Sequence, residues 1–211
     1  MYFYPYGFAM NGQTARLEAT RQILFRCGIR QIVETGTFRG TTTEWLAGFG
    51  VPVITIEAYD RSYYFAKRRL RDRKNVRTEL GDSVEVLKRL VDDIDTSAPT
   101  FFYLDAHWKD YLPLRDEMAL ILPHFAVPVV LIDDFEVPGQ TGYEYDDYGP
   151  GKALTTEYLM ACLAPGMGVF YPSTPPEQET GSRRGWVVVT PDAEMDARLD
   201  GIELLRRAAV V

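Results

Sequence analysis

The sequence predicts an α/β protein with a doubly wound, mostly parallel sheet of seven strands and a C-terminal antiparallel hairpin. Short apolar runs alternate five times with segments of helical pattern. Continuous apolar strands of this kind are typical of parallel sheets that helices cover on both faces. Near the C-terminus, two further apolar runs follow each other without an intervening helix. Strands joined in this way are expected to pair antiparallel.

The individual elements follow from apolar spacing and from the residues that break it. The expected parallel strands are 31–34, 51–56, 76–80, 100–104 and 127–132. Apolar residues at helical spacing, bounded by capping residues or glycine, predict the helices. These are 14–27, 41–49, 60–73, 83–91, 114–125 and 153–163. The hairpin strands are 169–171 and 186–190, separated by a Pro/Gly-rich stretch that excludes a helix.

Length and composition are those of one globular domain. The chain has 211 residues, of which 46% are hydrophobic and 25% are charged, close to the average of globular proteins. We therefore expect a single domain over residues 1–211, with 1–28 acting as a cap that combines an aromatic segment and a helix. The aromatic residues of that segment, Tyr2 to Phe8, are expected to roof a substrate pocket or to form a homodimer contact.

Charge and cysteine content exclude several classes of protein. A net charge of −7 argues against binding to nucleic acid or to anionic membranes, because phosphate recognition needs a basic surface. The basic run 67–74 is accordingly expected to be a solvated helix face. The two cysteines lie far apart in sequence, which excludes a disulfide scaffold and a cysteine-rich zinc site. With no apolar run of about 18 residues and no signal-peptide pattern, a soluble, cytoplasmic, reduced protein is expected.

Acidic residues close the predicted strands. In open α/β sheets, ligands bind beyond the carboxyl ends of the strands, near the point where the strand order reverses. Clustered carboxylates repel one another unless hydroxyl groups, a metal or another cation compensates them. The acidic residues at the strand ends are Glu34, Glu57, Asp82, Asp105, Asp133 and Asp134.

The first of these acids opens a glycine-containing turn over residues 34–40. Gly36 and Gly40 are spaced G-x-x-x-G, unlike the G-x-G-x-x-G turn that binds dinucleotide phosphates. A carboxylate just before the first glycine repels a pyrophosphate but suits a cationic ligand, and S-adenosylmethionine carries a sulfonium and an ammonium without a phosphate. An ordinary strand–helix turn is the structural alternative.

Two further strand ends fit an adenosine ligand. Glu57 is placed to accept hydrogen bonds from both ribose hydroxyls of an adenosine ligand, a feature that NAD-type sites share. Asp82 and Ser83 are placed to read an adenine amino group. A helix N-cap is the alternative role for Asp82 and Ser83.

Candidate catalytic residues are most concentrated in the segment 103–113, which contains Asp105, His107 and Lys109 and is followed by Asp133-Asp134. The ends of strands four and five are expected side by side, so that Asp105 and the later pair form a three-carboxylate cage. Mg²⁺ prefers such oxygen ligands and makes a bound hydroxyl more acidic. Lys109 is a candidate general base, and His107 is a competing one.

The stretch Leu104-Asp105-Ala106-His107-Trp108-Lys109-Asp110, followed by Asp133-Asp134, resembles the Mg²⁺-dependent, catechol O-methyltransferase-like enzymes. These belong to the class I S-adenosylmethionine-dependent methyltransferases, and their pattern is Leu-Asp-His-Trp-Lys-Asp with a later Asp-Asn pair. Ala106 is an insertion relative to this pattern, and Asp134 replaces an amide. The Asp-Asp pair is similar to that of the macrocin O-methyltransferase-like group. The resemblance covers about residues 30–140 and implies a Rossmann-like methyltransferase fold.

The resemblance also implies roles for individual residues. The implied metal ligands are Asp105, Asp133 and Asp134, and the implied catalytic residues are Lys109, His107 and Asp105. Trp108 or His107 would flank adenine. The implied cofactor-binding set is Glu34, Thr35, Gly36, Thr37, Gly40, Glu57, Ala58, Asp82, Ser83, Asp105 and Trp108.

The function predicted in this way is S-adenosylmethionine-dependent O-methylation of a small-molecule hydroxyl with Mg²⁺ assistance. A metal-dependent hydroxylase-like enzyme on the same fold is one alternative. The presence of only two histidines argues against a two-histidine, one-carboxylate iron site. A catalytically inactive module that binds an adenosine ligand is the other alternative.

Overall fold

The computed structural model describes residues 7–109 and 111–208. Tyr2, Phe3, Tyr4 and Tyr6 of the predicted aromatic cap lie outside these residues, as does Asp110. Residue contacts divide the chain into two compact units, Ile29–Val130 and Met1–Gly28 with Leu131–Val211. Each unit is described by itself, and the single-domain organisation stays a prediction.

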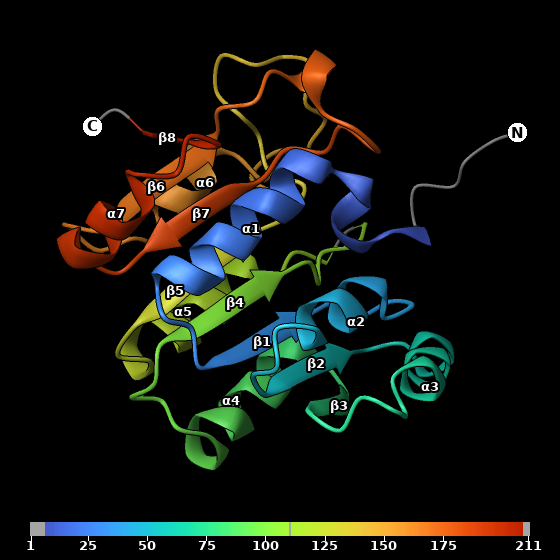
Figure 1. Ribbon diagram of the computed structural model, residues 1–211. Coiled ribbons are helices and arrows are strands. Elements are labelled where there is room, and N and C mark those ends of the chain that lie inside the picture. Colours follow the sequence, from blue (N-terminus) through green and yellow to red (C-terminus); the bar gives the residue numbers. More distant parts are fainter. Residues whose placement is uncertain (1–6, 110, 209–211) are drawn as a thin grey trace, which may run out of the picture. The chain divides into compact units, whose positions relative to one another are not determined.

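The unit Ile29–Val130 is a parallel α/β layer (Figure 1). Its strands are β1 (Gln31–Thr35), β2 (Val53–Glu57), β3 (Val76–Leu80), β4 (Thr100–Leu104) and the first residues of β5 (Pro128–Ile132). Its helices are α2 (Thr41–Ala47), α3 (Asp60–Arg69), α4 (Ser83–Asp93) and α5 (Leu114–His124). The strand order is β3-β2-β1-β4-β5, and β1 pairs parallel with both β2 and β4.

Burial explains why this strand order forms. All five residues of β2, β4 and β5 are buried, whereas β3 lies at the edge and is mostly half-exposed. The chain runs outward from β1 to β2 and β3, and then returns to the other side of β1 with β4. The strand order therefore reverses between β1 and β4, which is where a doubly wound sheet binds ligands. The predicted fold class is confirmed.

The second unit contains the C-terminal antiparallel strands. Its elements are η2 (Ala9–Gly12), α1 (Thr14–Arg26), α6 (Thr156–Met160), β6 (Gly168–Pro172), η3 (Pro176–Gln178), β7 (Val187–Thr190), α7 (Ala193–Leu199) and β8 (Leu205–Arg207). From the end of β5 the order continues β7-β6-β8, and β6 pairs antiparallel with both neighbours. The predicted hairpin is thereby confirmed.

The predicted number of seven strands was wrong, because the described residues form eight. The additional strand, β8, has only three residues, two of them arginine, so it lacks the apolar alternation that marks a strand. Helix α7 was also missed; Asp192 caps it by accepting the Met195 amide at 2.9 Å. Helix α6 is shorter than the predicted 153–163.

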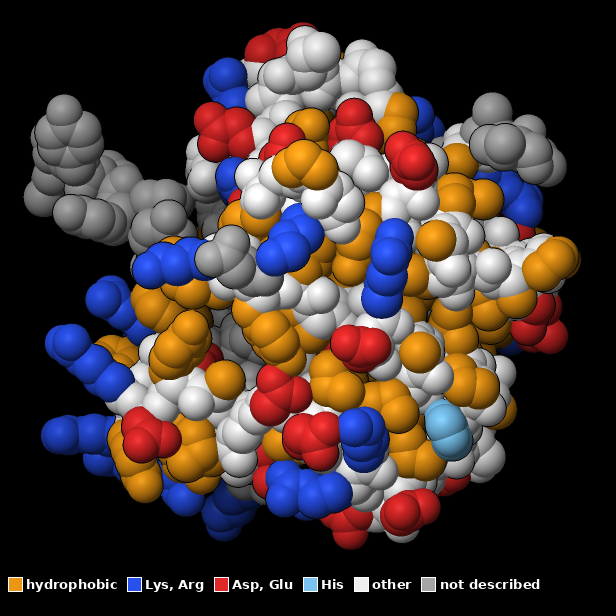
Figure 2. Space-filling model, turned by 180° about the vertical axis from the view of Figure 1, so that it is seen from behind, with side chains coloured by type: hydrophobic (Ala, Val, Ile, Leu, Met, Phe, Trp, Pro, Cys, Tyr) orange, Lys and Arg blue, Asp and Glu red, His pale blue; other side chains and the backbone are white. Residues whose placement is uncertain are grey.

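The surface and the cysteines match the remaining structural expectations. Figure 2 shows Lys and Arg side chains beside hydrophobic ones over α3, at the left of the view. Lys67, Arg68 and Arg69 are exposed there, as a solvated helix face requires. Neither Cys27 nor Cys162 forms a disulfide within the described part of the chain. Among the described residues, no helix combines the length and apolar character needed to cross a membrane.

Candidate active site

Glu34, the last residue but one of β1, is a buried carboxyl group at the centre of the first turn. Its Oε2 accepts hydrogen bonds from the Thr43 hydroxyl and, at 2.6 Å, from the Thr55 hydroxyl. Oε1 is buried and has no hydrogen-bond partner among the described residues. Burial raises the pKa of Glu34 to about 7, against the opposing effect of the two threonines. This carboxyl group therefore lacks the cation that would stabilise its charge.

Gly36 allows the first turn to pack closely against the residue that follows β4. Its φ is +84°, and its amide donates to the Ile56 carbonyl at 2.9 Å. A Cβ atom at this position would lie 2.0 Å from the Asp105 carbonyl oxygen. The Asp105 amide in turn donates to the Thr35 carbonyl at 3.0 Å. Because only glycine permits this approach, the structure brings the predicted residues Thr35, Gly36 and Asp105 together.

Glu57, at the end of β2, also stabilises this turn by accepting a backbone hydrogen bond from it. Its Oε2 accepts the Phe38 amide at 2.6 Å, and its Oε1 accepts the Tyr59 amide at 2.8 Å. Burial raises the pKa of Glu57, although these backbone amides oppose the effect. Since each carboxylate oxygen can accept two hydrogen bonds, Glu57 retains acceptor capacity for ligand hydroxyls.

Three other predicted residues belong to the same region. Thr37 is buried, and its amide donates to the Ile56 carbonyl at 3.1 Å. Gly40 caps α2 with φ +72° and packs against α3, where a Cβ would meet Leu70 at 3.2 Å. Ala58 is exposed just after β2. The turn 34–40 is thus built by hydrogen bonds to β2.

Asp82 has a structural role that the sequence left open. Its Oδ1 caps α4 by accepting the amides of Val84 at 3.0 Å and Glu85 at 3.2 Å. Its Oδ2 accepts the hydroxyl of Tyr111, a residue that the sequence did not single out. Ser83 is buried beside it. The N-cap alternative for Asp82 is therefore correct, and one carboxylate oxygen is held by a phenol.

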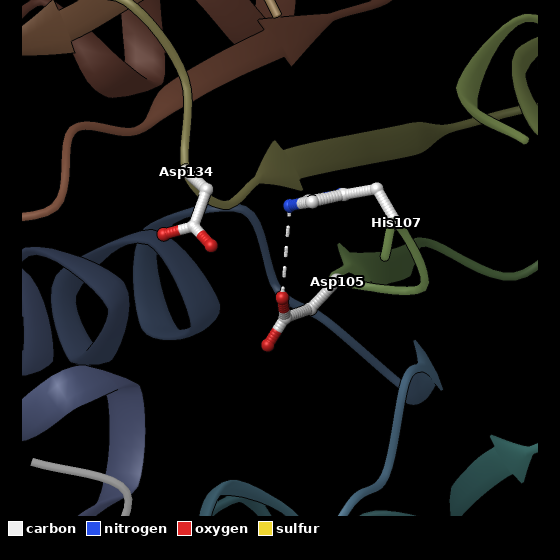
Figure 3. Close-up of side chains that lie close together, drawn as sticks. All are labelled: Asp105, His107 and Asp134. Carbon is white, nitrogen blue, oxygen red and sulfur yellow. Dashed lines mark ion pairs between the residues drawn. The ribbon is translucent and has the colours of Figure 1, made fainter. Parts of the chain in front are cut away.

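Asp105 and His107 form a pair after β4 (Figure 3). The His107 Nε2 lies 3.8 Å from Oδ1 of Asp105, and their side chains are 4% and 33% exposed. The carboxylate thus contacts solvent, while the imidazole stands behind it. Trp108 and Lys109 are exposed, and Lys109 makes no ion pair with a described carboxylate. The structure therefore brings His107, rather than Lys109, to Asp105.

Asp133 belongs to the other unit and is already compensated. Its Oδ1 accepts Arg16 Nη1 at 2.6 Å, and the two side chains are 1% and 0% exposed. The Asp134 amide donates to the same oxygen at 2.7 Å, and Asn11 Nδ2 donates to Oδ2 at 3.3 Å. The metal-ligand role of Asp133 stays a prediction, and Arg16 competes with any metal for this carboxylate.

Asp134 also has an arginine counter-ion within its unit. Arg184 Nε donates to Asp134 Oδ1 at 2.6 Å, and the same guanidinium pairs with Asp146 and, at 3.7 Å, with Glu144. Asp134 itself has a φ of +50°. Arg184 thus ties Glu144 and Asp146, in the segment after β5, to the end of that strand, and the sequence pattern did not single out this arginine.

No protein-family model and no curated protein matches this sequence. Solved structures do resemble it. An O-methyltransferase from Bacillus cereus in complex with SAH has a TM-score of 0.61 at 18% identity, over 82% of this chain and 79% of that one. TomG from Streptomyces achromogenes, an O-methyltransferase in complex with SAM, has 0.60 at 19%, over 83% and 80%.

A third similar structure is CalS10, an amino pentose methyltransferase from Micromonospora echinaspora described as SAM-bound. It has a TM-score of 0.60 at 16% identity, over 90% of this chain and 98% of that one. At such identities the likeness shows the fold alone. The predicted Rossmann-like methyltransferase fold is confirmed.

The buried Glu34 carboxyl predicts a specific pH dependence. Because its pKa rises from 4.5 to about 7 on folding, it contributes stability that is complete below pH 4.5 and is lost as the pH rises through about 7. This costs roughly 3 kcal/mol at neutral pH. In Glu34→Gln, urea unfolding between about pH 5 and pH 8 should show a correspondingly flatter fall in the free energy of unfolding. Parallel curves for both proteins would contradict the assigned burial effect.

Proposed function

We propose that the protein is an S-adenosylmethionine-dependent O-methyltransferase that acts on a hydroxyl group of a small molecule. The observation that carries the proposal is the turn 34–40, in which Gly36 lies against the Asp105 backbone and the buried Glu34 Oε1 has no hydrogen-bond partner within residues 7–109 and 111–208. A buried acid that lacks a cation suits the charged methionine end of this cofactor. The likeness to SAM- and SAH-bound methyltransferase structures supports the same reading.

The residues present fit an adenosine cofactor without a phosphate. When bound, S-adenosylmethionine supplies a methyl group on a positively charged sulfur. Glu34 would bind the positive end, and Glu57 would accept the ribose hydroxyls with its remaining lone pairs. The absence of a side chain at Gly36 lets the turn lie directly against the Asp105 backbone. These groups are held before binding by hydrogen bonds to β2, so little ordering is required.

We assign the acceptor hydroxyl to the Asp105–His107 pair. Asp105 is exposed enough to accept a hydrogen bond from a hydroxyl, and His107 behind it can share the proton. With the cofactor bound as the methyl donor, the Asp105–His107 pair would take up the proton that the acceptor hydroxyl loses. Catalysis would otherwise come from orientation. Lys109 is exposed and is not assigned the base role.

Mg²⁺ assistance stays part of the proposal and rests on Asp105. Its carboxylate is accessible, and His107 adds a nitrogen ligand beside it, although Mg²⁺ favours oxygen. Asp133 does not fit, because Arg16, Asn11 and a backbone amide occupy its oxygens. We therefore derive no step of the reaction from a metal, and Asp134 keeps only its sequence-predicted ligand role.

The hydroxylase alternative loses support. His124 is the other histidine of the chain, and it lies in the last turn of α5, where its Nδ1 pairs with the Leu120 carbonyl at 2.8 Å. A site with two histidine ligands on Fe²⁺ would need this residue.

Isothermal titration with S-adenosylhomocysteine tests the cofactor class. We expect micromolar binding, weakened at least tenfold in Glu57→Gln because a neutral amide accepts hydroxyl hydrogen bonds less strongly than a carboxylate does. Glu85→Gln, an exposed residue of α4, is the matched control and should bind normally. Titrations with Mg²⁺ and with EDTA, in the presence of a catechol or a sugar, test metal assistance. Absence of binding in both buffers would overturn the proposed function.

A further inference from the structure

The second oxygen of Asp82 is the feature that the proposed function does not explain. Oδ1 is committed to the N-terminus of α4, where it accepts two backbone amides. Oδ2 accepts the Tyr111 hydroxyl. For Asp82 to bind an adenine amino group as predicted, the amino group must use Oδ2, where it either takes the remaining lone pair beside the phenol or displaces the phenol.

Tyr111 is built to donate this hydrogen bond without being locked in place. Burial and the neighbouring Asp82 raise its pKa, so the phenol keeps its proton at physiological pH. The ring is still 44% exposed. It borders a hollow of about 470 Å³ between α4 and α5, whose other lining residues include Lys88, Asp116 and Leu120. A displaced phenol therefore has space to occupy.

We propose that Tyr111 is an affinity-determining residue of the cofactor site, whose hydroxyl competes with the adenine amino group for Oδ2 of Asp82. This inference rests on the proposed function. In the free protein the phenol donates to a carboxylate oxygen that water would otherwise solvate. On binding, the adenine amino group replaces the Tyr111 hydroxyl as the donor to Oδ2. Part of the free energy of the adenine interaction is therefore offset by the loss of the Tyr111 hydrogen bond. The site therefore binds its cofactor less tightly than its contacts allow.

The competition predicts an increase in affinity when the phenol hydroxyl is removed. Tyr111→Phe should bind S-adenosylhomocysteine about 3- to 10-fold more tightly, the range of one hydrogen bond in water. S-inosylhomocysteine carries a carbonyl oxygen where the adenine amino group stands, so its affinity should not rise in the variant. Titration calorimetry of both ligands against both proteins measures the difference.

Two further variants separate competition from a structural effect. Tyr64→Phe removes the hydroxyl of another exposed tyrosine, on α3, and should change neither affinity. In an Asp82→Asn background, where the contested oxygen becomes an amide nitrogen, Tyr111→Phe should no longer tighten binding. A structural role for Tyr111 would lower or preserve the affinity for both ligands.

The outcomes distinguish this inference from the proposed function. Binding of S-adenosylhomocysteine to the wild type, with no gain in Tyr111→Phe or an equal gain for S-inosylhomocysteine, would overturn the role of Tyr111 alone. Absence of binding to the wild type and to Tyr111→Phe would overturn the proposed function and this inference together.

Discussion

Replacing Arg16 by methionine is expected to destabilise the protein by about 3–5 kcal/mol. The Arg16 side chain is fully buried and its guanidinium lies 2.6 Å from Asp133, which is itself 1% exposed. Methionine fills much of the same volume but leaves the Asp133 charge in a nonpolar interior. The Asn11 amide and the Asp134 backbone amide remain, yet neither carries a positive charge. Urea unfolding followed by circular dichroism at neutral pH measures the loss.

A double-mutant cycle identifies the ion pair as the cause. Asp133→Asn should also destabilise, because it leaves Arg16 buried without its carboxylate. The double variant Arg16→Met, Asp133→Asn removes both charges and should lose clearly less stability than the two single variants added together. Arg21→Met provides the matched control, since Arg21 lies on the same helix, is exposed and pairs with Glu18. Its cost should stay within about 0.5 kcal/mol. Additive losses in the cycle would show that the charges are not coupled.

The strand ends of the parallel layer were predictable because they depend on local pattern. Each buried apolar run ends at a polar residue, and the sheet collects these ends along one edge. Glu34, Gly36, Glu57 and Asp105 were located in this way, and the turn that contains Glu34 and Gly36 is held by hydrogen bonds to β2. Their contacts lie within a unit in which β1, β2 and β4 are direct neighbours.

The partners of the acidic residues were not predictable from the same pattern. Arg16 lies 117 positions before Asp133, and Arg184 lies 50 positions after Asp134. A sequence pattern that shows two adjacent aspartates cannot say whether a metal or two guanidinium groups compensate them. One signal for Arg16 did exist. It shares a helical face with Ala19, Thr20 and Ile23, all of them buried, and a charged residue on such a face must have a buried partner.

The C-terminal part illustrates a different limit. Helix α7 begins after the N-cap Asp192, which the sequence alone does not distinguish from any other exposed aspartate. The three residues of β8 show no alternation of apolar and polar residues. β8 forms because its backbone pairs with β6 and because Arg207 reaches the buried Asp196. Long-range pairing of this kind overrides weak local preference.

Asp105→Asn is expected to lower kcat by 10²- to 10⁴-fold, the usual contribution of a general base. The asparagine side chain has nearly the same shape but cannot take up a proton, and it no longer supports a positive charge on His107 at 3.8 Å. The Asp105 backbone, which carries the contacts to Thr35 and Gly36, is unchanged. The dissociation constant of S-adenosylhomocysteine should therefore stay within about threefold of the wild-type value. Turnover of S-adenosylmethionine on an acceptor drawn from a panel of phenols and sugars measures kcat.

His107→Gln and Lys109→Ala decide which residue takes the proton. His107 is buried against Asp105, so its loss should lower kcat by at least 10²-fold. Lys109 is exposed and pairs with no described carboxylate, so Lys109→Ala should change kcat less than tenfold. A severe loss in Lys109→Ala, with His107→Gln close to wild type, would transfer the base role to the lysine that the sequence motif favours. Because all three variants alter side chains outside the turn 34–40, unchanged S-adenosylhomocysteine binding would show that the effect lies in the chemical step.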